Sequence, residues 1–313
     1  MKLRSLAAIA ASLSLLCSAA QAADPPSCHT VKLGDVGWSD NAAINGLASV
    51  VLKSLGYSAK PILLSLPITF ESLKTKDLDV FLDDWQPTMA ENIAPYIKNK
   101  TIDVVGVDLS GAKYTLAVPQ YVADAGVHSF ADLAAHKAEF DGKIYGIEPG
   151  NDGNRLIQSV IDKNAFGLGK FTMVESSEQG MLSEVRRKVD RKQWIVFLGW
   201  EPHPMNKNFK LGYLTGGDEY FGPNLGGATI YAVTRADYAT TCPNTSQLVK
   251  NMHFTLAMED AVMDDILNAK AEPDAAAAKY LKANPAVIDA WLAGVTTADG
   301  KPGAAAVKSS LAM

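Results

Sequence analysis

The chain shows its fold class first in Val31-Lys-Leu-Gly-Asp-Val36, which runs directly into Gly37-Trp38-Ser39-Asp40. The first six residues have the composition of a short strand. Residues 41–55 follow with apolar side chains on one helical face. That second segment ends at Gly56, a typical stop for a helix. A strand, a short loop and a helix in this order predict an α/β fold.

The same alternation continues along the chain, so we expect an α/β fold with mainly parallel strands. Further helices are predicted at Asp152–Lys163 and Ser177–Val189. Residues from Thr296 onward are expected to be frayed. Further strands are predicted at Pro61–Ser65, Asp79–Leu82, Ile102–Val107, Tyr114–Pro119, Lys143–Glu148, Phe171–Val174, Trp194–Leu198 and Thr229–Thr234.

Length predicts two lobes, because the chain has 313 residues and one hydrophobic core rarely grows beyond about 250–300 residues. No linker rich in proline, glycine and serine divides the sequence, so one lobe is predicted to be inserted into the other. We assign residues 23–112 and 213–313 to the first lobe and residues 113–212 to the second. The expected hinge crossings are Lys113–Pro119 and Lys210–Leu214.

Residues 1–22 have the order of a secretory signal peptide. Lys2 and Arg4 precede an apolar run from Leu6 to Leu16, and small residues end at Ala22. A membrane helix is the alternative, but this run is shorter than the ~20 apolar residues that span a bilayer. We expect the mature protein to be soluble in the periplasm.

Export changes the interpretation of the three cysteines. Cys17 lies in the predicted signal peptide, which leaves Cys28 and Cys242 as a pair in an oxidising compartment. We predict a disulfide between these two residues. Paired metal ligands or a reactive thiol are the alternatives.

Composition argues against several functional classes. The net charge is −5 and no basic block occurs, which disfavours nucleic-acid binding. The histidines have no metal-ligand spacing, and the sequence contains neither G-x-S-x-G nor a phosphate-binding loop. A secreted enzyme is the alternative. Asp83-Asp84 could serve as paired carboxylates, and Glu201 beside His203 could serve as an acid/base pair. We expect no catalytic residues, no metal and no other cofactor.

Three of the five tryptophans come at or directly after the ends of predicted strands, where ligands bind in open α/β sheets: Trp38, Trp85 and Trp200. Tyr114 begins the first expected crossing and could face the same cleft. Packing in the core is the alternative for each ring. It is the interpretation that we prefer for Trp194 and Trp291.

Converging aromatic rings can surround a large, poorly hydrated cation, because each ring carries negative charge density on its faces. Quaternary ammonium groups are the best known ligands of such a cage, and each desolvated contact contributes up to ~2 kcal/mol. Sugar binding also uses aromatic rings, but the rim of polar side chains that it normally adds is not evident in this sequence.

Two polar residues near these loops could orient a ligand. Asp40 could accept a hydrogen bond from a hydroxyl group, and Asn151 could offer its amide. Helix capping is the alternative for both residues, since each lies near the start of a predicted helix. Asp40 would repel a ligand carboxylate, so the pair favours choline over glycine betaine.

Four motifs contain these residues: Gly34-Asp35-Val36-Gly37-Trp38-Ser39-Asp40, Phe81-Leu82-Asp83-Asp84-Trp85-Gln86-Pro87, Gly150-Asn151-Asp152-Gly153-Asn154 and Gly199-Trp200-Glu201-Pro202-His203. With them the chain resembles the periplasmic substrate-binding proteins of ABC importers for quaternary ammonium solutes. The resemblance covers essentially the whole mature chain.

The resemblance implies a two-lobed periplasmic binding-protein fold of type II, with the ligand trapped at the hinge. It also implies a trimethylammonium cage of Trp38, Trp85, Tyr114 and Trp200, with Asp40 and Asn151 at the hydroxyl of choline. We therefore expect a monomer that captures choline for an inner-membrane ABC permease. Acetylcholine or glycine betaine would bind more weakly.

Overall fold

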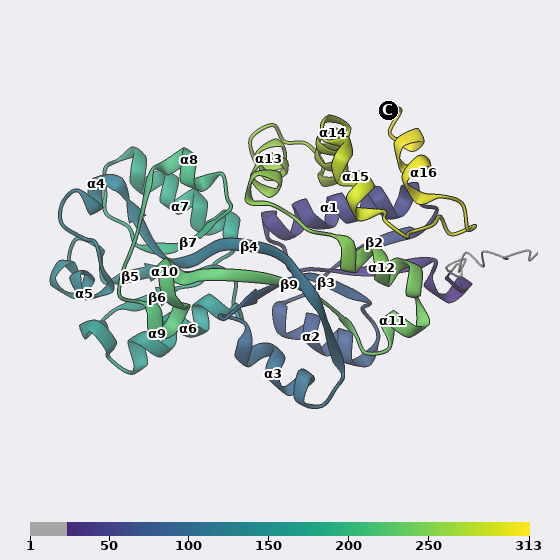
Figure 1. The fold of residues 1–313 in the computed structure, drawn as a ribbon. Coiled ribbons are helices and arrows are strands. Elements are labelled where there is room, and N and C mark those ends of the chain that lie inside the picture. The colour runs from purple at the N-terminus through teal and green to yellow at the C-terminus, as the bar shows by residue number, and fades with distance from the viewer. Residues whose placement is uncertain (1–23) are drawn as a thin grey trace, which may run out of the picture.

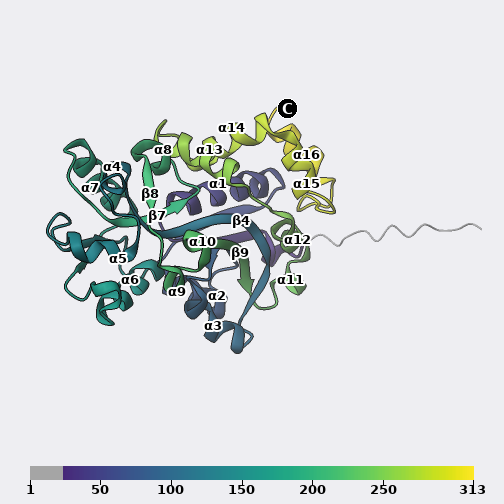
Figure 2. The ribbon, with the colours of Figure 1, turned by 60° about the vertical axis from the view of Figure 1, so that its left-hand side comes forward.

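The structure is a computed structural model that describes residues 24–313. The predicted signal peptide at residues 1–22, with Cys17, lies outside the described residues. Two bodies lie side by side, and two long strands, β4 (Ile102–Pro119) and β9 (Gly227–Arg235), run between them (Figures 1 and 2). The predicted α/β class is confirmed. Within residues 24–313, none of the helices has the length and apolar character needed to cross a membrane.

The first body is built on three parallel strands, with β1 (Thr30–Asp35) between β2 (Ser58–Leu63) and β3 (Val80–Gln86). In Figure 1, α1 and α13 to α16 lie above these strands, whereas α2 and α3 lie below them. Its helices are α1 (Ser39–Ser54), α2 (Leu66–Thr75), α3 (Ala90–Lys98), α11 (Tyr238–Thr241), α12 (Pro243–Asn251), α13 (Leu256–Leu267), α14 (Pro273–Ala283), α15 (Pro285–Trp291) and α16 (Gly303–Ser310).

Helix α1 is almost wholly buried, because α13 and α14 cover the side that turns away from the sheet. Gly46 permits this close packing, since a Cβ atom at that position would lie 2.7 Å from the carbonyl oxygen of Pro273 in α14. The C-terminal residues complete the same layer. Val307 of α16 is fully buried, so the expected fraying from Thr296 onward is wrong.

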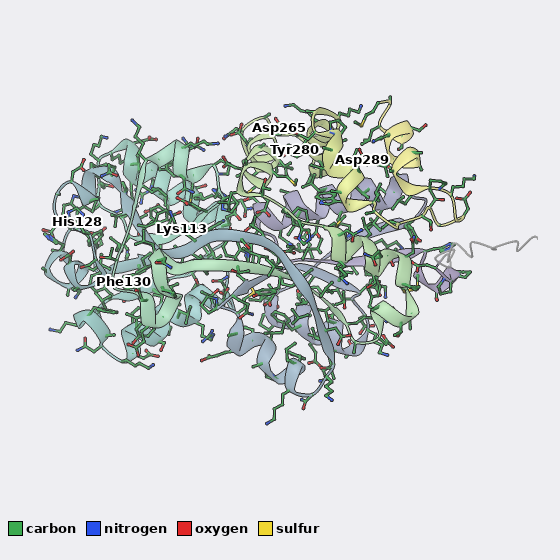
Figure 3. The ribbon with its side chains drawn as sticks, in the orientation of Figure 1. Lys113, His128, Phe130, Asp265, Tyr280 and Asp289 are labelled. Atoms are coloured by element: carbon green, nitrogen blue, oxygen red, sulfur yellow. A yellow bond between two sulfur atoms is a disulfide. The ribbon has the colours of Figure 1, made fainter. Side chains whose placement is uncertain are left out.

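The second body also has three parallel strands, with β5 (Lys143–Tyr145) between β6 (Thr172–Val174) and β7 (Phe197–Glu201). Phe130, labelled in Figure 3, is fully buried in its core against the rings of Phe166 and Phe221. Its helices are α4 (Gln120–Ala123), α5 (Phe130–Leu133), α6 (Asp152–Asp162), α7 (Glu178–Asp190), α8 (Met205–Phe209), α9 (Asp218–Phe221) and α10 (Pro223–Gly226).

Strand β4 is continuous over 18 residues, where the sequence predicted two separate strands at Ile102–Val107 and Tyr114–Pro119. It pairs antiparallel with β9 as far as Lys113, and from Lys113 onward it pairs antiparallel with β7 (Figure 3). Shifts of register between Val104 and Ala112 bend the strand on its way. The prediction of mainly parallel strands therefore holds within each body and is wrong at the junction.

The chain returns to the first body along β9, and the expected return crossing at Lys210–Leu214 is wrong. Those residues include β8 (Leu211–Tyr213), which pairs with Ala117–Pro119 at the far end of β4. Strand β9 instead pairs with both β4 and β3. The sheet order is β2-β1-β3-β9-β4-β7-β5-β6, with β8 on β4.

The predicted disulfide between Cys28 and Cys242 is present, and the two Cα atoms lie 5.7 Å apart. Asp24 strengthens the same attachment. Its carboxylate accepts hydrogen bonds from the backbone N–H groups of Asn244 at 2.7 Å and Thr245 at 2.9 Å. These groups open α12, where a negative charge is favourable. The start of the described chain is thus attached to α12.

Replacing Cys28 and Cys242 together by serine should lower the free energy of unfolding and leave the ligand site intact. The bond joins residues 214 positions apart, and the chain-entropy model assigns such a loop roughly 5 kcal/mol at most. Urea unfolding of the double variant should show a lower midpoint than the oxidised protein. Equal midpoints would contradict this stabilising role.

Candidate ligand-binding site

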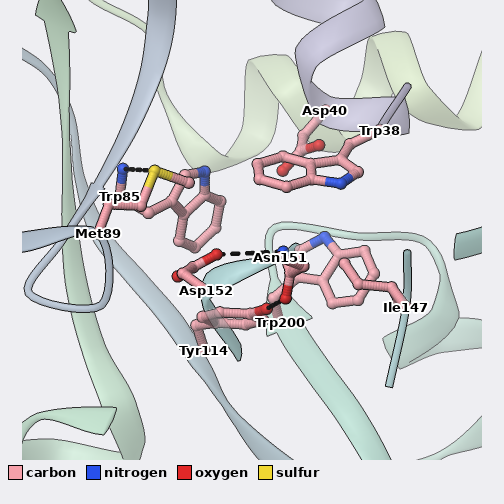
Figure 4. A pocket seen from close by; sticks show the side chains of 9 residues that line it. All are labelled: Trp38, Asp40, Trp85, Met89, Tyr114, Ile147, Asn151, Asp152 and Trp200. Atoms are coloured by element: carbon pink, nitrogen blue, oxygen red, sulfur yellow. Dashed lines mark hydrogen bonds between the residues drawn. The ribbon is translucent and has the colours of Figure 1, made fainter. Parts of the chain in front are cut away.

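A small cavity lies at the junction of the two bodies (Figure 4). All six residues that the sequence singled out line it, namely Trp38, Asp40, Trp85, Tyr114, Asn151 and Trp200. Met89, Ile147 and Asp152 complete the lining and were not predicted. The structure therefore brings the predicted residues together around one space.

Different elements supply the four aromatic rings. Trp38 is the residue before α1, Trp85 lies in β3, Tyr114 in β4 and Trp200 in β7. Trp85 and Trp200 each lie one residue before the end of their strand, whereas the sequence pattern predicted both in loops after a strand end. All four rings are buried, with 4–6% of their surface exposed. The core interpretation remains for Trp194 and Trp291, which do not line the cavity.

The rings meet at steep angles and enclose a space. The centroids of Trp85 and Tyr114 lie 5.9 Å apart with 60° between the ring planes, and those of Tyr114 and Trp200 lie 6.2 Å apart with 80°. Figure 4 shows Trp38 and Tyr114 on opposite sides of the cavity, with Trp85 at one flank. Such walls can contact a compact cation from several directions.

Carboxylates outside the cavity fix two of the indole rings. Trp38 donates a hydrogen bond from Nε1 to Glu148 at 2.9 Å, and Trp85 donates from Nε1 to Asp83 at 2.7 Å. The indole N–H of Trp200 is buried without a hydrogen-bond partner. Neither Glu148 nor Asp83 was predicted from the sequence as an anchor of these rings. Asp83 lies two residues before Trp85, and Glu148 is the last residue of a predicted strand, so only their positions near strand ends could have indicated this role.

Asn151 caps helix α6, as its alternative interpretation predicted. Its Oδ1 atom accepts a hydrogen bond from the backbone N–H of Asn154 at 3.1 Å and another from the hydroxyl of Tyr114 at 3.0 Å. Its Nδ2 group donates to Asp152 at 3.1 Å. These bonds fix the amide plane at the edge of the cavity.

Asp40 lies in the first turn of α1, and the capping position is taken by Trp38. The capping alternative for Asp40 is therefore wrong. Its side chain is 2% exposed, and its Oδ1 atom accepts a hydrogen bond from the backbone N–H of Asn41 at 2.9 Å. Burial, with the nearby charge of Glu178 as the second cause, raises the pKa of Asp40 to about 8.

Further buried carboxyl groups surround the cage. Burial raises the pKa of Asp83 well above its usual value, and the charge of Asp40 adds to the shift. Burial also raises the pKa of Asp84 to about 7 and the pKa of Glu148 above its usual range. In the described part of the chain, no group of three or more metal-binding side chains could hold a metal ion.

Comparisons with known proteins agree with this geometry. A choline-binding protein of an ABC transporter, solved in complex with choline, is 54% identical, with a TM-score of 0.91, over 92% of this chain and 100% of that chain. The unliganded, semi-closed form of such a protein is also 54% identical over the same shares, with a TM-score of 0.84. The fold of this chain thus matches the choline complex more closely than the semi-closed form.

A curated relative is the glycine betaine/carnitine transport binding protein of Listeria monocytogenes, which is 27% identical over 157 residues, or 50% of this chain and 51% of the relative. Residues 29–283 match the family described as the substrate-binding domain of the ABC-type glycine betaine transport system. Members of this family bind solutes for transport and are not enzymes. The chain therefore belongs to the family of substrate-binding domains of ABC-type glycine betaine transport systems.

Proposed function

We propose that this protein captures choline between two closing lobes and delivers it to an ABC permease. The observation that carries the proposal is the cavity itself, in which four aromatic rings and two buried carboxyl groups, those of Asp40 and Asp152, line the same small space. A trimethylammonium group has no N–H donor, so it gains little from a salt bridge and much from ring faces. Trp38, Trp85, Tyr114 and Trp200 are the proposed cage.

The polar end of the cavity supports an alcohol as the second group of the ligand. Asp40 can accept a hydrogen bond from the choline hydroxyl, and Asn151 lines the same cavity. Glycine betaine is the second candidate, and the family match favours it. Its carboxylate would meet Asp40 and Asp152, both buried. Acetylcholine has no hydroxyl to donate, so we expect it to bind more weakly than choline.

We propose the lobe division predicted from the sequence, residues 23–112 with 213–313 and residues 113–212, with its second boundary moved toward β9. The chain pairing favours a second exchange point nearer β9, because Thr215 forms a bridge with Ser129 in the second body. Trp38 and Trp85 come from one lobe, and Asn151 and Trp200 from the other. Only the closed arrangement can bury the cation fully, so choline would shift the lobes toward it.

The expected cellular setting follows from the same proposal. Residues 1–22 would direct export, and the mature chain would act in the periplasm as a monomer. Its partner would be the inner-membrane permease of the ABC transporter, which receives choline when the lobes open. No part of this role requires a cofactor or nucleic acid.

Trp200→Ala should weaken choline binding by about 30-fold or more, because the change removes one wall of the cage. Isothermal titration calorimetry measures the affinity, and circular dichroism checks the fold. Trp194→Ala is the matched control, since this ring packs on His136 and Phe140 outside the cavity. Wild-type affinity in Trp200→Ala would refute the cage.

Asp40→Asn should weaken choline about tenfold, because a hydrogen bond to a charged acceptor is replaced by a neutral one. Glycine betaine should lose much less affinity, or gain some, since a repulsive charge is removed. Titration of both ligands into the same variant compares the two effects. Equal losses would mean that Asp40 acts only through the structure of α1.

Choline affinity should fall as the pH is lowered from 8 to 6. The pKa of Asp40 is raised to about 8 without ligand, and a cation binds the ionised carboxylate better than the neutral acid. Binding below this pH must therefore expel a proton, which costs at most about tenfold in affinity per pH unit. The negative charges of Glu178 and Glu148 contribute to this raised pKa of Asp40.

Calorimetry in two buffers of different ionisation enthalpy measures this proton release directly. Asp40→Asn should remove most of it. Affinity that stays constant between pH 6 and pH 8, without proton release, would contradict the assignment of Asp40 as the titrating group.

A further inference from the structure

A cluster of three buried polar side chains lies beside the cavity without lining it. Ser39 opens α1 in the first body, Glu178 opens α7 in the second body, and His203 follows β7 in the second body. Their exposed fractions are 4%, 1% and 2%. None of the three belongs to the cavity wall, so the cage does not explain them.

Glu178 binds the first residue of a helix in the other body. Its Oε2 atom accepts a hydrogen bond from the backbone N–H of Ser39 at 2.9 Å, and its Oε1 atom accepts one from the Ser39 hydroxyl at 2.6 Å. The free N–H groups at a helix start favour a negative charge. Both carboxylate oxygens of Glu178 therefore have donors from the opposite body.

His203 completes the cluster. Its Nδ1 atom accepts a hydrogen bond from the backbone N–H of Met205 at 2.9 Å, which assigns the ring proton to Nε2. The Nε2 atom faces the hydroxyl oxygen of Ser39 at 3.0 Å and Oε1 of Glu178 at 3.3 Å. With this tautomer, His203 donates to Ser39 and Ser39 donates to Glu178. Every polar group of the cluster then has a partner.

The cluster lies next to two residues of the cavity wall, Asp40 and Trp200. Asp40 follows Ser39 in the first turn of α1, so the bonds of Glu178 fix the helix end that carries Asp40. The ring of His203 lies 5.0 Å from the ring of Trp200, edge to face at 69°. Trp200 has no hydrogen bond at its indole nitrogen, which leaves packing to hold the ring.

We propose that Glu178, with Ser39 and His203, forms an interlobe latch that holds the closed state and positions Asp40 and Trp200. Glu178 is thus a positioning residue that never touches the ligand. A rotation of one body away from the other about β4 and β9 separates Ser39 from Glu178, which breaks the latch. The inference rests on the proposed binding function and deepens it, since it assigns the retention of choline to groups outside the cage.

Two other contacts between the bodies are exposed and make useful comparisons. Arg155 pairs with Glu91, whose side chain is 77% exposed, and Lys207 pairs with Asp260, where the lysine is 68% exposed. Exposed ion pairs contribute little, because water competes for both charges. The latch is enclosed, so its hydrogen bonds are not exchanged for water while the lobes stay closed.

Glu178→Gln keeps the shape of the side chain and removes the charge, and it should weaken choline by about tenfold or more. Stopped-flow fluorescence separates the two rate constants. The loss should appear as faster dissociation with nearly unchanged association, because choline enters the open state before the latch forms. Ser39→Ala should act in the same direction, and the double variant should lose less than the sum of the two effects.

Glu184→Gln and Asp260→Asn are the controls. Glu184 lies on the same helix and pairs with Arg187 within the second body, and Asp260 belongs to an exposed interlobe pair. Both should keep the wild-type dissociation rate. Unchanged dissociation in Glu178→Gln, or equal acceleration in Asp260→Asn, would overturn the latch. A wild-type protein that binds no choline would instead overturn the proposed function, and the latch with it.

Discussion

The buried carboxyl group of Asp40 is the constraint on which the chemistry of the site depends. In the described part of the chain, no lysine or arginine forms an ion pair with it, and the neighbouring charges that act on it are negative. An isolated charge in such a place is costly, so the group resists ionisation until a cation arrives. In the proposed function, choline would supply that charge with a group that aromatic rings hold well. Under this proposal the aromatic cage would hold the ammonium group of the ligand and Asp40 would hold its hydroxyl group.

This arrangement depends on two bodies meeting at two long strands. Strands β4 and β9 carry the chain between them, and the cavity residues come from both sides. Other contacts link the bodies around the ligand space, including the hydrogen bond from Trp38 to Glu148 and the cluster of Ser39, Glu178 and His203. On this account, affinity arises partly in the cage and partly in the contacts that keep it closed. Release to the permease would then require only that the contacts holding the two bodies together be broken.

Much of the site could be predicted from the sequence, because Trp38, Trp85 and Trp200 stand at or beside the ends of short apolar runs, and such ends meet at one edge of a parallel sheet. The disulfide could also be predicted, because Cys28 and Cys242 are the two cysteines outside the predicted signal peptide. The continuity of β4 could not be predicted, since its middle residues pair with β9, more than a hundred positions away. The hydrogen bond between Ser39 and Glu178 could not be predicted either, because the two residues lie 139 positions apart and no local sequence pattern indicates their contact.

The central claim is that the buried carboxyl group makes this aromatic cage select an alcohol rather than a carboxylate. The most direct test is competition calorimetry on the wild-type protein at pH 8, with choline and glycine betaine as rival ligands. We predict that choline displaces glycine betaine and binds at least about tenfold more tightly, since only choline can donate to Asp40. Glycine betaine binding as tightly as choline, or more tightly, would contradict the account.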